Sequence, residues 1–70
     1  MKDVAMRLRQ VREAAGYASA QEAADRFGWV YATYAGHENG NRGMKTDVLA
    51  KYARAFKVDP GWLLEGRSLG

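Results

Sequence analysis

The sequence predicts a small, compact all-α domain built from five helices. Two observations predict this fold class. Apolar residues recur at helical spacing along most of the chain, and no stretch shows the strict alternation of a half-buried strand. Glycines and helix-capping residues interrupt these patterns at short intervals. The 70 residues include no Cys, so neither disulfides nor Cys-ligated zinc can stabilise the core, and tight helix packing, an oligomeric partner or both are expected to do so.

The first helix is expected over residues 3–15. Its apolar residues fall on one stripe of a helix: Val4, Leu8, Val11 and Ala15. Gly16 follows and is suited to the left-handed conformation that commonly ends a helix.

The second helix is expected over residues 20–27. Ser19 and Glu22 have the spacing of a capping box, in which each side chain satisfies backbone N–H groups at the helix start. Gly28 can take the positive φ that a tight turn needs, and it ends this helix.

The third helix is expected over residues 31–38, after a link of only three residues, and it closes at Asn39-Gly40. The residues of its inward pattern are Val30, Thr33, Tyr34 and His37. We expect His37 to be a core residue with its polar atoms satisfied, and not a ligand or switch.

The fourth helix is expected over residues 46–56, and a short fifth one begins at Asp59-Pro60, where Asp59 suits the N-cap and Pro60 the first helical position. The inward residues of the fourth helix are Val48, Leu49, Tyr52 and Phe56, and those of the fifth are Trp62, Leu63 and Leu64. Residues 1–66 are therefore expected to form one domain, with 67–70 as a tail or the start of a linker.

Composition favours binding over catalysis. Eleven Lys and Arg against eight Asp and Glu give a net charge of +3, which permits a polyanionic partner without requiring one. With one His, two Ser and no Cys, the chain offers little for a catalytic triad or a metal site, so we expect no enzyme activity, no metal and no cofactor. No apolar run suits a membrane span or a signal peptide, so a cytoplasmic protein without a membrane partner is expected.

Two short helices joined by a three-residue turn that contains Gly form a supersecondary unit with a known use, the helix-turn-helix of DNA-binding proteins. The third helix supports this use. Its outward residues are short or uncharged: Tyr31, Ala32, Ala35, Gly36 and Asn39. Such a face is unusual for a solvated surface and suits a helix that presses into a groove.

Five stretches point to a particular family: RLRQVR at 7–12, the segment 19–28, ENG at 38–40, YARAFKV at 52–58 and WLLEG at 62–66. In this order and at these spacings, the chain resembles the helix-turn-helix domains of phage repressors and Cro-type regulators, the lambda-repressor-like family. The resemblance covers about residues 6–66. It implies a sequence-specific transcriptional regulator of the repressor type that binds double-stranded operator DNA as a homodimer.

The resemblance also implies roles for individual residues. The third helix would lie in the major groove. Residues at its base-reading positions are Tyr31, Ala32, Thr33 and Gly36. Residues expected to contact phosphates are Gln21, Asn39, Asn41, Arg42 and Lys45. Residues expected at the dimer interface are Asp59, Trp62 and Leu63, although a core role for Trp62 or Leu63 stays open.

An ion pair is also expected. Arg12 lies at the margin of the apolar stripe of the first helix, where its long side chain can cover the core. Glu38 closes the third helix, where the helix dipole disfavours an anion. In the resembled family these positions hold an Arg and a Glu that pair beneath the reading helix, so we expect a buried Arg12–Glu38 pair. The alternative is that both side chains are solvated.

The sequence departs from the family pattern in the residues that would touch DNA. Ala20 stands where many relatives place a phosphate-clamping Gln, and the link before Ser19 is one residue longer than usual. The base-reading positions hold no Gln or Arg, so bidentate base recognition is not available from the third helix. A protein-interaction or antitoxin-like module on the same scaffold therefore stays open, as does a C-terminal domain in a longer native chain.

Overall fold

The computed structural model describes residues 2–41 and 43–66, and this part of the chain contains helices and no strands. The elements are α1 (Lys2–Ala14), α2 (Ala20–Phe27), α3 (Tyr31–Glu38), α4 (Thr46–Phe56) and α5 (Pro60–Glu65). The all-α, five-helix prediction is confirmed, and only the ends of α1 differ from expectation, by one residue each. The expected tail at 67–70 lies outside the described residues.

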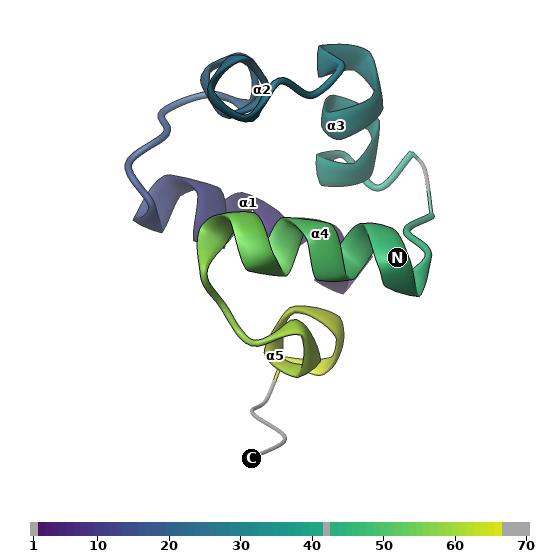
Figure 1. Ribbon diagram of the computed structural model, residues 1–70. Helices are drawn as coiled ribbons and strands as arrows, with labels where there is room; N and C mark the ends of the chain where they lie inside the picture. The colour runs from purple at the N-terminus through teal and green to yellow at the C-terminus, as the bar shows by residue number, and fades with distance from the viewer. Residues whose placement is uncertain (1, 42, 67–70) are drawn as a thin grey trace.

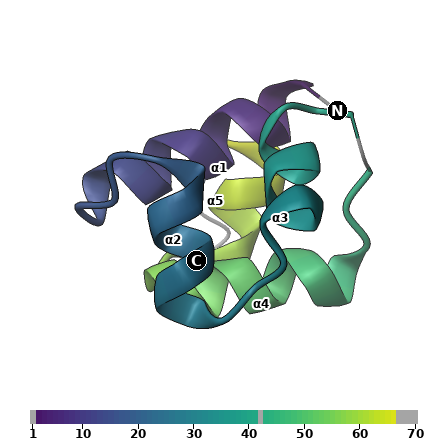
Figure 2. The ribbon, with the colours of Figure 1, turned by 90° about the horizontal axis from the view of Figure 1, so that it is seen from above.

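The helices are arranged in three tiers (Figure 1). α2 and α3 lie at one end, α1 and α4 cross the middle, and α5 lies at the opposite end. α1 packs against each of the other four helices, so it is the central element of the fold. Viewed from the α2–α3 end, the turn between these two helices passes over α4 (Figure 2).

The core is dominated by aromatic side chains. The largest fully buried residues are Tyr34, Tyr52, Leu8 and Leu63. The ring of Trp29 centres this cluster, because its centroid lies 4.7 Å from Phe27, 4.9 Å from Tyr52 and 5.1 Å from Tyr34. Large aromatic groups bury much area per residue, which suits a domain too small for many aliphatic layers.

The helix ends follow the expected signals with one difference. Ser19 Oγ accepts a hydrogen bond from the Glu22 N–H at 3.2 Å, whereas the Glu22 carboxylate accepts from the Ala18 N–H at 2.7 Å and not from that of Ser19. Gly28 ends α2 at φ 74°, in the left-handed region. Asp59 Oδ1 accepts from the Gly61 N–H at 2.9 Å and caps α5.

Three expectations about inward faces are wrong. Ala15 and Leu64 are exposed. Each lies at the end of a helix, beyond the part of that helix that packs on the core. Val30 is exposed as well, because it is the N-cap of α3, with extended backbone at φ −73° and ψ 121°. Helical spacing does not apply to a residue outside the helix, so its side chain leaves the inward stripe.

A polar contact joins the first and last helices. Arg7 donates from Nε to the Leu63 carbonyl at 2.9 Å and from Nη2 to the Leu64 carbonyl at 2.6 Å. Carbonyl groups in the last turn of a helix have no partner within it. Arg7 of α1 therefore caps the C-terminal end of α5.

Candidate nucleic-acid interface

The α2–α3 turn is anchored to the core by one side chain. Trp29 is the middle residue of the turn, and its N–H donates to the Ala24 carbonyl at 2.8 Å. Its ring packs on Tyr34 of α3 and on Tyr52 and Phe56 of α4. Because Trp29 points inward, its neighbour Val30 points outward, with 68% of its surface exposed.

The exposed side of α3 begins with apolar residues. Tyr31 is 47% exposed, Ala32 is exposed, and Thr33, Ala35 and Gly36 are partly exposed. No residue from Val30 to Gly36 has a charged or amide side chain. Of the expected base-reading residues, Tyr31 and Ala32 thus lie fully on the surface, and Thr33 and Gly36 lie at its margin.

The inward side of α3 is fixed by buried polar contacts. His37 is buried, and its Nδ1 lies 2.6 Å from the hydroxyl of Tyr52 on α4. His37 is therefore a core residue with a hydrogen-bond partner, as expected. Burial raises the pKa of Tyr52 to about 12.

Arg12 and Glu38 meet beneath α3 in a bidentate ion pair. Arg12 Nε lies 2.9 Å from Glu38 Oε2, and Nη2 lies 3.0 Å from Oε1, with the two side chains only 5% and 7% exposed. Arg12 Nη1 also donates to the Tyr17 carbonyl at 2.8 Å. Burial alone would lower the pKa of Arg12, but the hydrogen bonds and charge of Glu38 outweigh it and raise that pKa.

Tyr34 lies beside this pair. Burial and then the Glu38 carboxylate raise the pKa of its phenol above the ordinary value. Among the described residues, its buried hydroxyl has no hydrogen-bond partner. The Tyr34 hydroxyl therefore makes no hydrogen bond of ordinary geometry there, although the neighbouring Glu38 carboxylate contributes to its raised pKa.

The expected phosphate contacts surround α3. Asn39, Asn41 and Lys45 are exposed and belong to the segment that leads from α3 into α4. Gln21 is exposed in the first turn of α2, where its Nε2 donates to Asp25 Oδ1 at 2.8 Å. Arg42 lies outside the described residues.

Two residues near the turn were missed by the sequence reasoning. Val30 was assigned to the inward face, although the residue just before a helix start is the N-cap, and that position could have revealed its exposure. Lys51 of α4 is not among the expected site residues. Its Nζ lies 5.7 Å from the Trp29 ring centroid and 5.3 Å from that of Tyr52. It lines a hollow of about 260 Å³ together with Gly28, Trp29, Val30, Thr33, Tyr34 and Tyr52.

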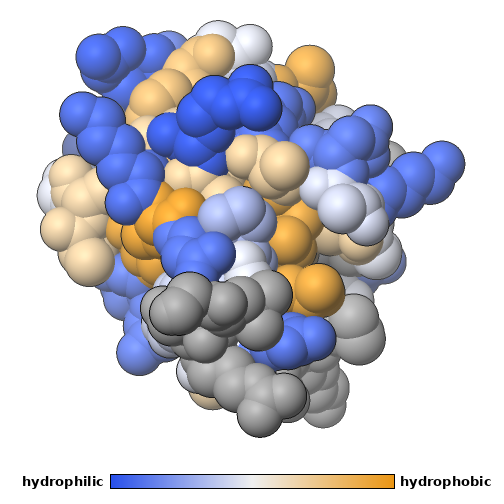
Figure 3. Space-filling model, turned by 60° about the horizontal axis from the view of Figure 1, so that its bottom comes forward, coloured by the Kyte–Doolittle hydropathy of each residue, from blue (hydrophilic) through white to orange (hydrophobic). Residues whose placement is uncertain are grey.

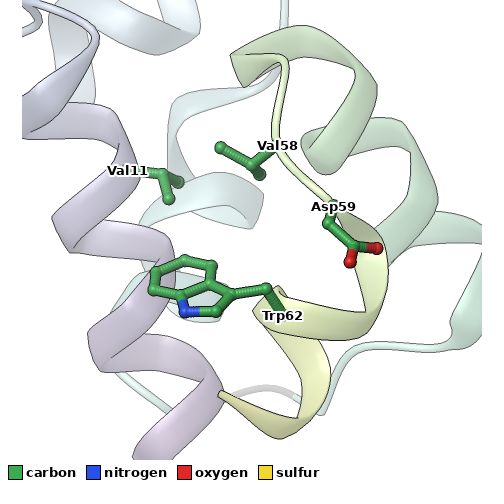
Figure 4. A pocket seen from close by; sticks show the side chains of 4 residues that line it. All are labelled: Val11, Val58, Asp59 and Trp62. Carbon is green, nitrogen blue, oxygen red and sulfur yellow. The ribbon is translucent and has the colours of Figure 1, made fainter. Parts of the chain in front are cut away.

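A second surface lies near α5. Val11, Val58, Asp59 and Trp62 line a hollow of about 310 Å³ between α1 and the start of α5. The side chains of Val11, Val58 and Trp62 point toward one another, and the Asp59 carboxylate points away from them (Figure 4). On the face around α5, hydrophobic residues reach the surface in several places between hydrophilic ones (Figure 3).

Of the two roles left open for Leu63, the structure shows the core one. Leu63 has no exposed surface, because it packs in the core between α5 and the rest of the domain. Trp62 is only partly buried and remains accessible in the hollow. In this short helix the two neighbours thus have different roles.

A family model described as a helix-turn-helix domain matches residues 3–65. The chain belongs to this helix-turn-helix family. This membership is consistent with the lambda-repressor-like resemblance. The helix-turn-helix unit after which the family is named consists of α2, the turn and α3. No curated protein and no solved structure gives a significant match. Within the described part of the domain, no helix is long and apolar enough to cross a membrane.

Proposed function

We propose that this helix-turn-helix domain binds double-stranded operator DNA sequence-specifically and acts as a dimeric transcriptional regulator of the repressor type. The observation that carries the proposal is the contrast between the two sides of α3. Its inner side is held by the Arg12–Glu38 and His37–Tyr52 contacts, and its outer side is exposed and uncharged. A rigid helix whose outer side carries mostly small, uncharged side chains suits insertion into the major groove, which is about 12 Å wide.

The charge distribution supports the same function. Gln21 on α2, and Asn39, Asn41 and Lys45 in the segment after α3, are exposed polar groups, while α3 itself presents no cation. Phosphates border the major groove on both sides, so donors beside the helix are placed to bind them and to position it. We assign Lys45 and these amides to phosphate binding, and Arg42 by its place in the sequence. Tyr31, Ala32, Thr33 and Gly36 are assigned to the base edges.

The test is a titration of duplexes selected from a random pool. We expect the logarithm of the affinity to fall linearly with the logarithm of salt concentration, with a slope of about −0.9 per neutralised phosphate. Lys45→Ala should weaken binding to all sequences about equally and flatten the slope by about one unit. Arg9→Ala is the matched control, because it removes the same charge from an exposed site on α1 that pairs with Glu13 at 3.6 Å.

Two outcomes would contradict this assignment. If the domain binds no duplex at any salt concentration, the scaffold serves another purpose, such as a protein-interaction or antitoxin-like module. If Lys45→Ala changes the preferred base at one position and leaves the slope intact, Lys45 reads a base and does not bind phosphate.

A further inference from the structure

The side chains at the leading end of α3 form an apolar surface, in which the Tyr31 hydroxyl is the one side-chain hydrogen-bonding group. It is formed by Val30, Tyr31 and Ala32, three consecutive exposed residues. Val30 and Tyr31 are two of the few large apolar residues that the domain exposes. In the helix-turn-helix unit, the N-terminal residues of the second helix contact base edges.

This surface is held in place. The Val30 carbonyl accepts the Tyr34 N–H at 3.0 Å, and Tyr34 is fully buried. On the other side of Val30, the Trp29 ring is fixed against Phe27 at 4.7 Å and Tyr52 at 4.9 Å. The isopropyl group of Val30 is therefore presented by a rigid segment, and little order has to be gained when it makes a contact.

One feature of the major-groove edge complements these apolar side chains. Base pairs present hydrogen-bond donors and acceptors there, together with the C5-methyl group of thymine. A donor or acceptor covered by Val30 or Ala32 would lose water without gaining a partner, which is unfavourable. A methyl group covered by the same side chains gains apolar contact.

Resting on the proposed function, we infer that Val30, Tyr31 and Ala32 form a reader of the pyrimidine C5-methyl group in duplex DNA. Thymine and 5-methylcytosine carry this methyl at the same ring position, so both bases fit the reader. The domain therefore discriminates thymine from uracil and 5-methylcytosine from cytosine. Its DNA binding depends on the methylation state of cytosines placed under Val30.

The expected effect is modest and additive. Burying one methyl-sized group contributes about 0.8 kcal/mol, which corresponds to about a fourfold change in affinity. Two copies on a symmetric site would multiply this to about 15-fold when both half-sites lose the methyl.

The experiment uses the best selected duplex with single-base replacements. Each thymine of a half-site is replaced by deoxyuridine, which removes only the methyl, and each cytosine by 5-methylcytosine, which adds one. We expect a loss of about fourfold at one or two adjacent thymines. We also expect a site with cytosine in place of such a thymine to regain affinity when that cytosine is methylated.

A variant connects the effect to the protein. Val30→Ser removes both methyl groups of Val30, and the domain should fold because Ser is a preferred N-cap residue. It should abolish the thymine-to-uracil difference at one position while the uracil duplex binds as before. Met6→Ser is the matched control, an exposed apolar residue of α1 whose replacement should leave the difference unchanged.

The outcomes separate the reader from the function on which it rests. Equal affinities for thymine and uracil at every position, with salt-dependent binding intact, overturn the methyl reader and leave DNA binding standing. An unchanged difference in Val30→Ser overturns the assignment to Val30. Absence of salt-dependent binding to any duplex overturns the proposed function, and the reader with it.

Discussion

At the scale of single residues, Arg12 connects three segments of the chain beneath α3. It binds both carboxylate oxygens of Glu38 and the carbonyl of Tyr17. It thereby joins the end of α1, the segment before α2 and the last residue of α3. A buried guanidinium with these partners fixes where α3 lies, and its removal would leave the Glu38 carboxylate buried without compensation.

The first prediction concerns this pair. Arg12→Met and Glu38→Gln should each lower the free energy of unfolding by about 3–5 kcal/mol, because the remaining partner becomes an uncompensated buried group. The double variant should lose much less than the sum. Urea unfolding of the three variants checks this, and single losses below about 1 kcal/mol without coupling would mean that the pair contributes as little as a surface one.

The second prediction concerns alkaline pH. A Tyr in the unfolded chain loses its proton near pH 10. In the folded domain, burial raises the pKa of Tyr52 to about 12, and it also raises the pKa of Tyr34. Above pH 10 the unfolded state therefore binds fewer protons than the folded one, and stability falls as pH rises. Urea unfolding between pH 8 and pH 11 should show this fall.

Phenylalanine variants separate the two tyrosines. Tyr34→Phe should make the decline less steep and leave the stability at pH 8 unchanged or higher, because its hydroxyl has no hydrogen-bond partner. Tyr52→Phe should lower stability at pH 8 by about 1 kcal/mol, because it removes the contact with His37. A stability that stays flat up to pH 11 in the unmodified domain would contradict the prediction.

At the scale of elements, the sequence predicted the helices well because several helix ends carry a local signal. Ser19 and Asp59 accept the N–H groups of α2 and α5, and Gly28 ends α2 in the left-handed region, as their residue types indicate. The end of α4 has no such signal. Lys57 takes φ 60° there, a conformation that its side chain does not favour.

The third prediction compares these two helix ends. Gly28→Ala should lower the free energy of unfolding by about 1–2 kcal/mol, because Ala is strained at a positive φ. An added Cβ at Gly28 meets no atom within 4 Å, so no clash contributes. Lys57→Gly should raise stability by roughly 1 kcal/mol for the converse reason. The same sign of change in both variants would show that backbone conformation does not decide these positions.

The sequence could not predict which apolar residues of short elements face inward. α5 has only six residues, so helical spacing does not distinguish Leu63 in the core from Trp62 in the hollow and Leu64 outside. Val30 was misplaced because N-cap geometry depends on where the helix starts. The Arg12–Glu38 pair came from the family resemblance, since neither position alone identifies the partner.

At the scale of the whole molecule, we propose separate surfaces for DNA contact and for self-association. α2 and α3 occupy one end of the domain, and the hollow with Trp62 lies near α5 at the other (Figure 1). We propose that Trp62, together with Asp59 at the rim, contacts a second copy on DNA. Two domains related by a two-fold axis would then place two α3 helices on one face of the duplex.

The fourth prediction follows from this symmetry. The best selected sites should be imperfect palindromes with half-sites about 34–36 Å apart, one helical turn. Sedimentation of the complex at saturating protein should give two copies per duplex. A duplex with a single half-site should bind one copy at lower affinity, and one copy on the full site would remove the two-fold model.

The contact between Arg7 and the end of α5 also has a consequence for how the domain is made. Its two partners lie 56 and 57 positions after it in the chain, so α1 leaves the ribosome before α5 does. At about 5–20 residues per second, the delay between the two helices is several seconds. During that interval its apolar stripe lacks one of its neighbours, and the nascent chain is open to chaperones and proteases. The domain completes its core only once its last helix has emerged, so a stalled or truncated product without α5 should be degraded.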